Sequence, residues 1–277
     1  MTNGRFKSVH RVLANGSKYR VLMIFFGNSC RWTLESGMYM KGTLYPSLGN
    51  LQFLETLVIS GMKQIGRPIP ESFSKLTHLT QLVLEDNSFE GSIPPSLGQL
   101  PLLKTLSLSG NHLKGQIPPS LGNLRNLIQM NFGKNFQTGP IPPTKNLNSL
   151  LYLDLTYNLL SGLIPDFFGQ FHNLTSIDLS NNKLSGQIPS SLCNLPNLMD
   201  LSLSQNQLTG RIPDQIGNIK SLTTLSLSDN QLTGQIPVSV SRLQKFWQLN
   251  LSRNGFSHPS PRILPNGIPS LLSIDLS

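Results

Sequence analysis

The chain has 277 residues and a formal net charge of +9, but only 13% of its residues are charged. The charge is uneven, because positions 1–40 hold six basic residues against one acidic residue, and the remaining excess is spread thinly over positions 41–277. Nucleic-acid-binding proteins need a clustered basic stripe, so no nucleic-acid partner is expected.

Positions 1–40 are predicted to form an atypical basic N-terminal segment with a degenerate N-terminal cap. The run VLMIFF at 21–26 has six apolar residues, fewer than the roughly 7–15 of a signal-peptide core. It is also far shorter than the roughly 20 residues that cross a membrane. The run therefore predicts neither a convincing signal peptide nor a transmembrane segment, and a divergent cap or strand is the preferred interpretation.

Beyond this segment, the phrase L-x-x-L-x-L-x-x-N returns at a nearly constant interval. A fixed period in this range indicates stacked structural repeats. Positions 41–277 are therefore predicted to form one elongated domain with about nine full repeats and a truncated tenth. The asparagines that close the phrase are separated by 24, 24, 23, 24, 24, 24 and 24 residues: Asn87, Asn111, Asn135, Asn158, Asn182, Asn206, Asn230 and Asn254.

One repeat, at 103–129, shows what each unit must contain. The alternation around Leu106 and Leu108 has strand periodicity, whereas Gly115 and Pro118 exclude a long helix. The unit is therefore predicted to be a short strand, a turn and an irregular or 3₁₀ back. The repeated Asn lies where the chain turns into the core, and its amide can satisfy backbone groups of its own turn and of the next coil. We predict a structural asparagine ladder.

The full repeat, L-x-x-L-x-L-x-x-N-x-L-x-G-x-I-P-x-x-L-G-x-L, resembles the plant-specific leucine-rich repeat, and positions 198–219 show it nearly complete. The resemblance implies an α/β repeat solenoid: a right-handed horseshoe with a concave parallel β-sheet and an irregular or 3₁₀ convex side. The family includes receptor-like kinase ectodomains, receptor-like proteins without a kinase, polygalacturonase-inhibiting proteins and a cold-induced ice-binding relative. Because fold is not function, the repeat alone does not choose among them.

The two cysteines depart from the family pattern. Its members usually close the first coil with a disulfide in a C-x-W-x-G-V-x-C-like motif, but here Cys30 and Trp32 are followed by no second cysteine. Cys193 stands where other repeats have Gly98 or Gly122, which indicates a buried, inert thiol. A Cys30–Cys193 bond is rejected, because about six coils at about 4.8 Å each separate residues whose Cα atoms would need to lie within about 7 Å.

Two repeats are irregular. The unit at 142–145 (PPTK) is one residue short, and the last full unit has His258 at the Gly position and Ser260 at the Ile position. Both changes are expected on the back of the coil, where length changes are best tolerated. The chain stops in the middle of the repeated phrase at Ser277, which suggests a fragment or a degenerate member of the family.

The concave face is predicted to be the partner-binding surface. Parallel sheets are normally covered on both faces, yet the outward positions here are mostly Ser, Thr, Asp, Asn and Gln, so this face is open to water. Outward aromatic side chains are the best interface anchors, and a few charged side chains accompany them. The predicted partner-binding residues are Gln81, Glu85, Lys104, Gln129, Asn131, Lys134, Tyr152, Asp154, Tyr157, Asp178, Asp200, Trp247, Gln248 and Asn250.

Catalytic and metal chemistry are not expected. Asp154 and Asp178 occupy one column on adjacent strands, with a Cβ separation of about 5 Å that resembles the carboxyl pair of a retaining glycosidase. However, Leu-Asp-Leu is a common wording of the repeat, and no sugar cleft accompanies the pair. The histidines show no metal-ligand spacing, and no phosphate-binding loop follows a strand, so no catalytic residue, metal or cofactor is assigned.

Asn15, Asn173 and Asn250 fit the glycosylation sequon. Short motifs of this kind arise by chance in an Asn- and Ser-rich repeat, so they support secretion only weakly. A glycan on Asn250 would also block part of the concave face.

The sequence therefore predicts a non-enzymatic recognition module of a plant receptor-like protein, acting in defence or developmental signalling. Its ligand would be a protein or peptide, and a co-receptor kinase is a further candidate partner. The resemblance implies an extracellular place, in the cell wall or at the plasma membrane. One alternative is an inhibitor of a pathogen cell-wall hydrolase, with Tyr152, Asp154, Tyr157, Asp178 and Asp200 as its contact patch. A truncated, non-functional family member is another, and ice binding is disfavoured because the concave columns are too mixed.

Overall fold

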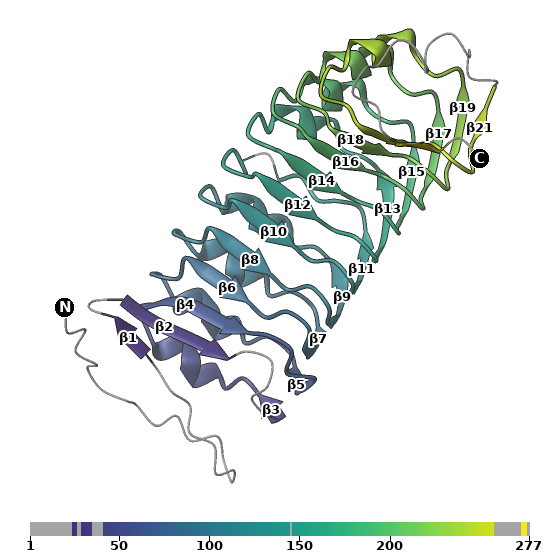
Figure 1. The fold of residues 1–277 in the computed structure, drawn as a ribbon. Coiled ribbons are helices and arrows are strands. Elements are labelled where there is room, and N and C mark those ends of the chain that lie inside the picture. Colours follow the sequence, from purple (N-terminus) through teal and green to yellow (C-terminus); the bar gives the residue numbers. More distant parts are fainter. Residues whose placement is uncertain (1–23, 27–28, 35–40, 145, 258–272, 276–277) are drawn as a thin grey trace.

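The computed structural model describes residues 24–26, 29–34, 41–144, 146–257 and 273–275. Similar coils stack side by side into one elongated array (Figure 1). A typical coil consists of a strand of one sheet, a tight turn, a strand of a second sheet and a 3₁₀ helix that leads back to the start of the next coil. Asn15, the His258 unit and the chain end at 276–277 lie outside the described residues.

The first sheet forms the concave face, as the sequence predicted, and has twelve strands. From β2 onward all neighbours are parallel, whereas β1 and β2 pair antiparallel. Consecutive coils align residue for residue, so that Met130 lies between Leu106 and Leu153. Equivalent side chains therefore form straight rows across the sheet. The strands are β1 (Ile24–Phe26), β2 (Ser29–Leu34), β4 (Leu54–Ile59), β6 (Gln81–Val83), β8 (Thr105–Ser107), β10 (Gln129–Asn131), β12 (Tyr152–Asp154), β14 (Ser176–Asp178), β16 (Asp200–Ser202), β18 (Thr224–Ser226), β20 (Gln248–Asn250) and β22 (Ser273–Asp275).

A second sheet of ten strands runs along the flank of the array. The sequence interpretation expected irregular backbone here, but the N-x-L-x-G segment alternates inward and outward residues, which suits a short strand. Neighbouring strands are offset by two residues per coil, since Leu163 pairs with Ser185. The strands are β3 (Lys41–Thr43), β5 (Gln64–Arg67), β7 (Ser88–Gly91), β9 (His112–Gln116), β11 (Phe136–Gly139), β13 (Leu159–Leu163), β15 (Lys183–Gly186), β17 (Gln207–Gly210), β19 (Gln231–Gly234) and β21 (Gly255–Phe256).

Short 3₁₀ helices stack along the convex side. In most coils the Pro of the Ile-Pro pair is the N-cap, with an extended backbone that directs the chain into the helix. The helices are η1 (Pro46–Asn50), η2 (Glu71–Lys75), η3 (Pro95–Gln99), η4 (Pro119–Asn123), η5 (Asp166–Gln170), η6 (Ser190–Asn194), η7 (Asp214–Asn218) and η8 (Val238–Arg242). Five of these helices (η1, η3, η4, η5 and η7) have a Gly near their end. This Gly allows close stacking, because a Cβ on Gly98 would lie 2.2 Å from the carbonyl oxygen of Ser120.

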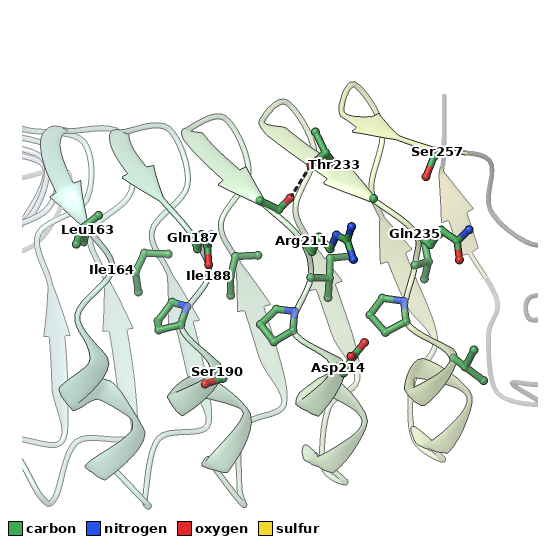
Figure 2. A pocket seen from close by; sticks show the side chains of 18 of the residues that line it. Leu163, Ile164, Gln187, Ile188, Ser190, Arg211, Asp214, Thr233, Gln235 and Ser257 are labelled. Carbon is green, nitrogen blue, oxygen red and sulfur yellow. Dashed lines mark hydrogen bonds between the residues drawn. The ribbon is translucent and has the colours of Figure 1, made fainter.

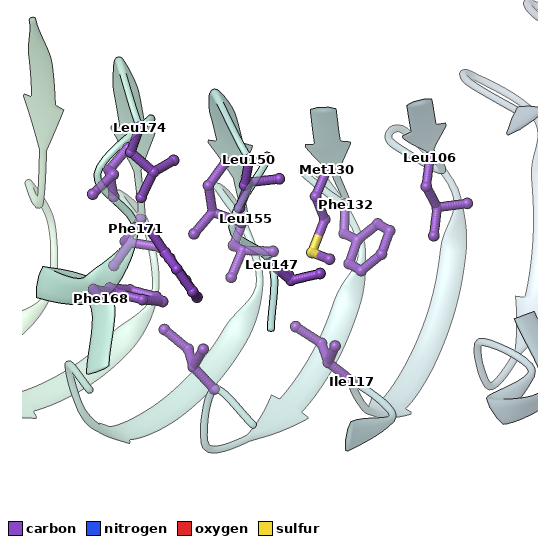
Figure 3. Packing of buried hydrophobic residues seen from close by; sticks show 14 of the residues in the cluster. Leu106, Ile117, Met130, Phe132, Leu147, Leu150, Leu155, Phe168, Phe171 and Leu174 are labelled. Carbon is purple, nitrogen blue, oxygen red and sulfur yellow. The ribbon is translucent and has the colours of Figure 1, made fainter. Parts of the chain in front are cut away.

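The short repeat between β11 and β12 has no 3₁₀ helix among its described residues, which exclude position 145. Large side chains fill the space beneath it, including Phe132, Phe168 and Phe171, each at most 1% exposed (Figure 3). Only a cavity of about 10 Å³ remains, lined by Met130 and Ile141 among others. The hydrophobic core therefore passes through the irregular unit without interruption.

The repeated asparagines connect each coil to the preceding one. Asn111 accepts the N–H of Phe89 at 3.0 Å and donates to the carbonyl of Leu84 at 2.7 Å, both in the preceding coil. It also donates to Leu108 and Ser109 in its own turn. The sequence predicted that the amide would bond its own turn and the next coil. That prediction was wrong about the second coil, because the partners lie in the preceding one. The cause is geometric: the side chain leaves its strand toward the preceding turn.

Replacing Asn111 by Ala should lower the free energy of unfolding by about 2–4 kcal/mol, because it leaves buried backbone groups in two coils without partners. The matched control is Asn126→Ala, which removes a single exposed bond from Asn126 to the carbonyl of Pro101 and should cost about 1 kcal/mol or less. Urea unfolding of both variants measures the difference. Equal losses would show that the ladder has no special role.

Gln137 is an unfavourable residue in the core. It is 0% exposed, and neither Nε2 nor Oε1 has a hydrogen-bond partner. Equivalent positions in the neighbouring coils hold Leu113 and Leu160, both fully buried. Gln137→Leu should therefore raise the free energy of unfolding by about 1–3 kcal/mol, since it removes the cost of burying an unpaired amide. A lower urea midpoint than that of the wild type would contradict this account.

Candidate functional site

The predicted partner-binding residues fall mainly into two rows on the concave face. One row contains the residue before the central strand leucine, and the other contains the residue after it. The register places Tyr152 beside Gln129 and Ser176, and Asp154 beside Asn131 and Asp178. The first row includes Gln81, Gln129, Tyr152, Asp200 and Gln248, and the second includes Asn131, Asp154, Asp178 and Asn250.

The acidic and amide side chains of the second row fold back onto their own turns. Oδ1 of Asp154 accepts the N–H of Thr156 at 2.9 Å, and Oδ1 of Asp178 accepts both the N–H and the hydroxyl of Ser180. Asn131 and Asn250 accept the N–H two residues later in the same way. One oxygen of each group therefore has a structural role, which leaves the other carboxylate oxygen or the amide nitrogen for a ligand.

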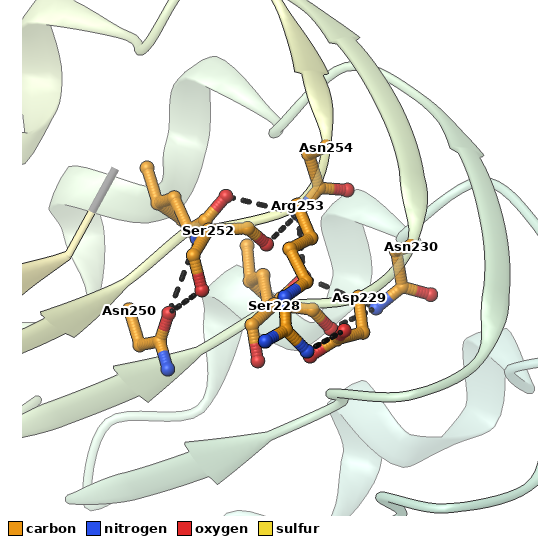
Figure 4. Close-up of polar contacts among 9 residues, drawn as sticks. Ser228, Asp229, Asn230, Asn250, Ser252, Arg253 and Asn254 are labelled. Atoms are coloured by element: carbon orange, nitrogen blue, oxygen red, sulfur yellow. Dashed lines mark hydrogen bonds and ion pairs between the residues drawn. The ribbon is translucent and has the colours of Figure 1, made fainter. Parts of the chain in front are cut away.

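A row of hydroxyl residues lies beside these side chains, and the sequence interpretation did not assign it a role. Its members follow the second strand leucine and are at most 9% exposed. Figure 4 shows the arrangement at Ser252, whose hydroxyl donates to Asn250 at 2.8 Å. The repeated Leu-Ser-x-Asn phrase in the sequence could have revealed this row, because its Ser always follows the second strand leucine. The row consists of Thr156, Ser180, Ser204, Ser228 and Ser252.

The residue before each ladder asparagine adopts a left-handed backbone. Asp86, Lys134, Tyr157 and Arg253 have φ between 51° and 54°, which is uncommon for residues other than glycine. Tyr157 is 55% exposed at this position, in the turn between β12 and β13. The same geometry places Arg253 against Asp229 at 2.9 Å (Figure 4). The hydrogen bond to Asp229 raises the pKa of the Arg253 guanidinium, but solvent screens this exposed pair.

Two adjoining hollows form a shallow depression on the concave face, here called the central trough. One has a volume of about 400 Å³ and is lined by Tyr152 and Asp154 among others, and its neighbour of about 200 Å³ includes Asp200. They share Ser176 and Asp178. The trough is lined by Gln129, Met130, Asn131, Tyr152, Leu153, Asp154, Ser176, Ile177, Asp178, Asp200, Leu201, Ser202, Thr224, Leu225, Ser226 and Gln248.

The trough separates the predicted residues into two groups. It brings together seven of them: Gln129, Asn131, Tyr152, Asp154, Asp178, Asp200 and Gln248. The remaining seven residues lie outside its lining. Among these, Glu85 accepts a hydrogen bond from the hydroxyl of Ser107, and Trp247 is 42% exposed beside Gln248.

Asp154 and Asp178 form a direct cross-strand pair. Like charges directly opposite each other in a sheet destabilise it, and Asp200 lies diagonally across the next strand. The trough therefore concentrates negative charge near Tyr152, which is 50% exposed. This arrangement suits a ligand that carries a positive group beside an apolar one.

The two described glycosylation candidates differ in position. Asn173 is exposed and donates from Nδ2 to the carbonyl of Asn148 at 2.7 Å, outside the concave rows. Asn250 lies within a concave row, where its Oδ1 is bound by the hydroxyl of its own sequon serine. A glycan at Asn250 would crowd the concave face, whereas one at Asn173 would leave it open.

Cys193 is a free thiol that is 2% exposed. Burial raises the pKa of this thiol to about 11, so it stays protonated near neutral pH. Its position in η6 is one where other coils need glycine for close stacking.

Two features of the described part of the chain bear on metal binding and membrane crossing. No group of three or more His, Cys, Asp or Glu side chains is arranged there to hold a metal ion. In the same residues, no helix combines the length and the hydrophobicity that crossing a bilayer would require.

The sequence pattern of the family described as leucine rich repeat matches residues 50–113, 143–184, 173–232 and 196–256. A comparison with curated protein sequences gives no match. Among solved structures, the fold is similar to PEPR1 in the PEPR1–AtPEP1 complex, with 37% identity and a TM-score of 0.83. That match covers 86% of this chain but only 33% of PEPR1.

Two further similar structures are a receptor kinase and an ice-binding protein. The Arabidopsis receptor kinase HAESA, solved with the peptide hormone IDA and the co-receptor SERK1, is 31% identical with a TM-score of 0.75, and the match covers 86% of this chain and 45% of HAESA. A plant ice-binding protein is 30% identical with a TM-score of 0.71, and the match covers 82% of this chain and 73% of that protein. The chain thus spans less than half of either receptor structure.

Cys193 should resist alkylation in the folded protein, because thiolate is the reactive form and burial disfavours it. We expect iodoacetamide at pH 8 to leave the Cys193 peptide unmodified over hours in buffer and to modify it rapidly in urea. Mass spectrometry of that peptide distinguishes it from Cys30. Rapid labelling without denaturant would contradict the assignment of Cys193 as an inert core residue.

Proposed function

Because the chain belongs to the leucine-rich repeat family in its plant-specific form, we propose that it is a non-enzymatic recognition module of a receptor-like protein. In this proposal the central trough holds a peptide or a protein segment. The observation that carries the proposal is the convergence of Tyr152, Asp154, Asp178 and Asp200 on one open concave surface.

The physical basis is preorganisation. The trough is built on paired strands of a continuous sheet, so binding needs little ordering of the protein, and less of the binding free energy is lost. Tyr152 supplies a large, rigid contact of the kind that dominates interface energetics. The unpaired oxygens of Asp154 and Asp178 add electrostatic attraction, which increases association rate and specificity.

Two of the similar structures support the proposal of a peptide or protein ligand. HAESA was solved with a peptide hormone and a co-receptor, and PEPR1 with AtPEP1. By analogy, we propose an extracellular position for this chain, a peptide or protein ligand, and signalling through a co-receptor kinase. A role in defence or development follows the same analogy.

Inhibition of a pathogen cell-wall hydrolase is the alternative function for the same surface. Its support is that Tyr152, Asp154, Asp178 and Asp200, four residues of the predicted inhibitor patch, line the central trough. The fifth, Tyr157, is exposed but lies outside the trough lining. Ice binding receives no such support on this face, because the row from Asn131 to Asp154, Asp178 and Ser202 changes in charge and shape.

The test is binding of the purified full chain to three panels: plant receptor-kinase ectodomains, synthetic secreted plant peptides and fungal polygalacturonases. Tyr152→Ala should weaken binding of the authentic partner by about 2 kcal/mol, or about 30-fold. Asp154→Asn should weaken it more at low than at high salt, since the amide keeps the turn but loses the charge. Isothermal titration calorimetry measures both effects.

Tyr45→Ala is the matched control, since Tyr45 is a partly exposed tyrosine at the N-cap of η1, outside the concave rows. It should leave affinity unchanged. If Tyr152→Ala also leaves affinity unchanged for every partner found, the trough is not the binding surface. Binding only to polygalacturonases would replace the receptor proposal with the inhibitor.

A further inference from the structure

A second hollow lies on the flank of the array, away from the concave face. It has a volume of about 1220 Å³ and shares no lining residue with the central trough. One wall is the second sheet from β13 to β19, and the other is the start of helices η5 to η8 (Figure 2). We call it the flank groove, and it is lined along its length by Leu163, Gln187, Arg211 and Gln235, one from each coil.

The groove arises from the G-x-I-P segment. Gly210 and Gly234 have φ of 78° and 80°, a backbone conformation that favours glycine. The x side chain of the preceding coil lies directly over each glycine. Cγ of Gln187 is 2.9 Å from where a Cβ of Gly210 would stand, and Cγ of Arg211 is equally close to that of Gly234. The amide and guanidinium side chains therefore lie along the groove, from coil to coil.

These polar groups are available for binding. Gln187, Arg211 and Gln235 are exposed, and no hydrogen bond within the described part of the chain uses their side-chain ends. The only ion pair among the described residues joins Arg253 to Asp229, so Arg211 is not paired with the groove's own carboxylates. The Thr233 hydroxyl donates to the carbonyl of Gly210 at 3.3 Å (Figure 2) and keeps its own lone pairs free to accept.

The charge and shape of the groove indicate the ligand class. Two carboxylates, Asp166 and Asp214, outnumber the single guanidinium of Arg211, which disfavours a polyanion. Strands β15, β17 and β19 are paired on both sides, so this stretch of the groove offers no free strand edge to bind a peptide by β-addition. Among the described residues, β21 is the terminal strand of this sheet. The exposed lining of the groove is more polar than apolar, and its shallow floor consists of nearly buried isoleucines such as Ile188 and Ile212 and of prolines.

We propose that the flank groove binds an unbranched, uncharged oligosaccharide that lies across the coils from β13 to β21. The β13 coil presents Leu163 to the groove, whereas the four coils from β15 to β21 present Gln187, Arg211, Gln235 and Ser257. These polar groups recur at a spacing of about 4.8 Å, close to the repeat of pyranose rings in an extended chain. Neighbouring sugar hydroxyls can donate to and accept from the side chains of Gln187, Arg211 and Gln235. The apolar faces of the rings would rest on the Ile and Pro floor.

The test is calorimetric titration of the full chain with cellohexaose, an extended neutral hexamer. Saturable binding is expected, and the double variant Gln187→Ala/Gln235→Ala should weaken it about tenfold, since each substitution removes hydrogen bonds to an uncharged ligand. Gln116→Ala is the matched control. Gln116 lies over Gly139 as Gln187 lies over Gly210, but it does not line the groove, so its replacement should change nothing.

Three further titrations distinguish the flank groove from the central trough and a neutral sugar from an anionic sugar or a peptide. Tyr152→Ala should leave cellohexaose binding intact, so that failure of this proposal and failure of the trough proposal are distinguishable. A hexamer of galacturonate and an unstructured neutral hexapeptide should bind at least tenfold more weakly than cellohexaose. The proposal is overturned if cellohexaose does not saturate, if the double variant binds it as well as the wild type, or if either competitor class binds more tightly.

Discussion

The connection between coils through the buried asparagine amide is the interaction on which the rest of the structure depends. A single coil has too few inward side chains to form a core of its own, so its stability comes from its neighbours. Each ladder amide, from Asn87 to Asn254, satisfies a donor and an acceptor of the preceding coil. From Asn111 onward, it also bonds two carbonyls of its own turn. Because this bond is repeated at a fixed position, it also sets the register of the concave sheet. The straight rows of outward side chains follow from that register.

The same repetition generates two surfaces with different chemistry. On the concave face, short strands and turns hold Asp154 and Asp178 side by side, while their Oδ1 atoms stabilise the following turns. On the flank, a glycine in each coil makes room for the side chain of the coil before it. A ligand on either surface would contact several coils at once, which is how a repeat protein builds an extended binding surface from small units.

The irregular positions show how much local variation a linear array tolerates. Gln137 places an unpaired amide in the core, Cys193 occupies a site where glycine stacks closely, and the unit around Pro142 lacks a 3₁₀ helix among its described residues. Because a repeat contacts only its neighbours in such an array, each defect is expected to affect its own coil and the two beside it. The large side chains of Phe168 and Phe171 fill the space beside the short unit, so the core continues through it.

The sequence by itself determined the solenoid, the concave rows and the positions of the ladder asparagines, because these follow from a period repeated within each unit. It also placed Asp154 beside Asp178 and identified Cys193 as a core residue, since both follow from counting positions in the repeat. Only the tertiary structure decided the second sheet, the turn bonds that occupy Asp154 and Asp178, the limits of the trough and the existence of the flank groove. These depend on the offset and spacing between coils, which result from packing contacts between residues about two dozen positions apart. A repeat pattern in the sequence shows which residues recur, whereas the stacking of the coils decides which of these residues come into contact.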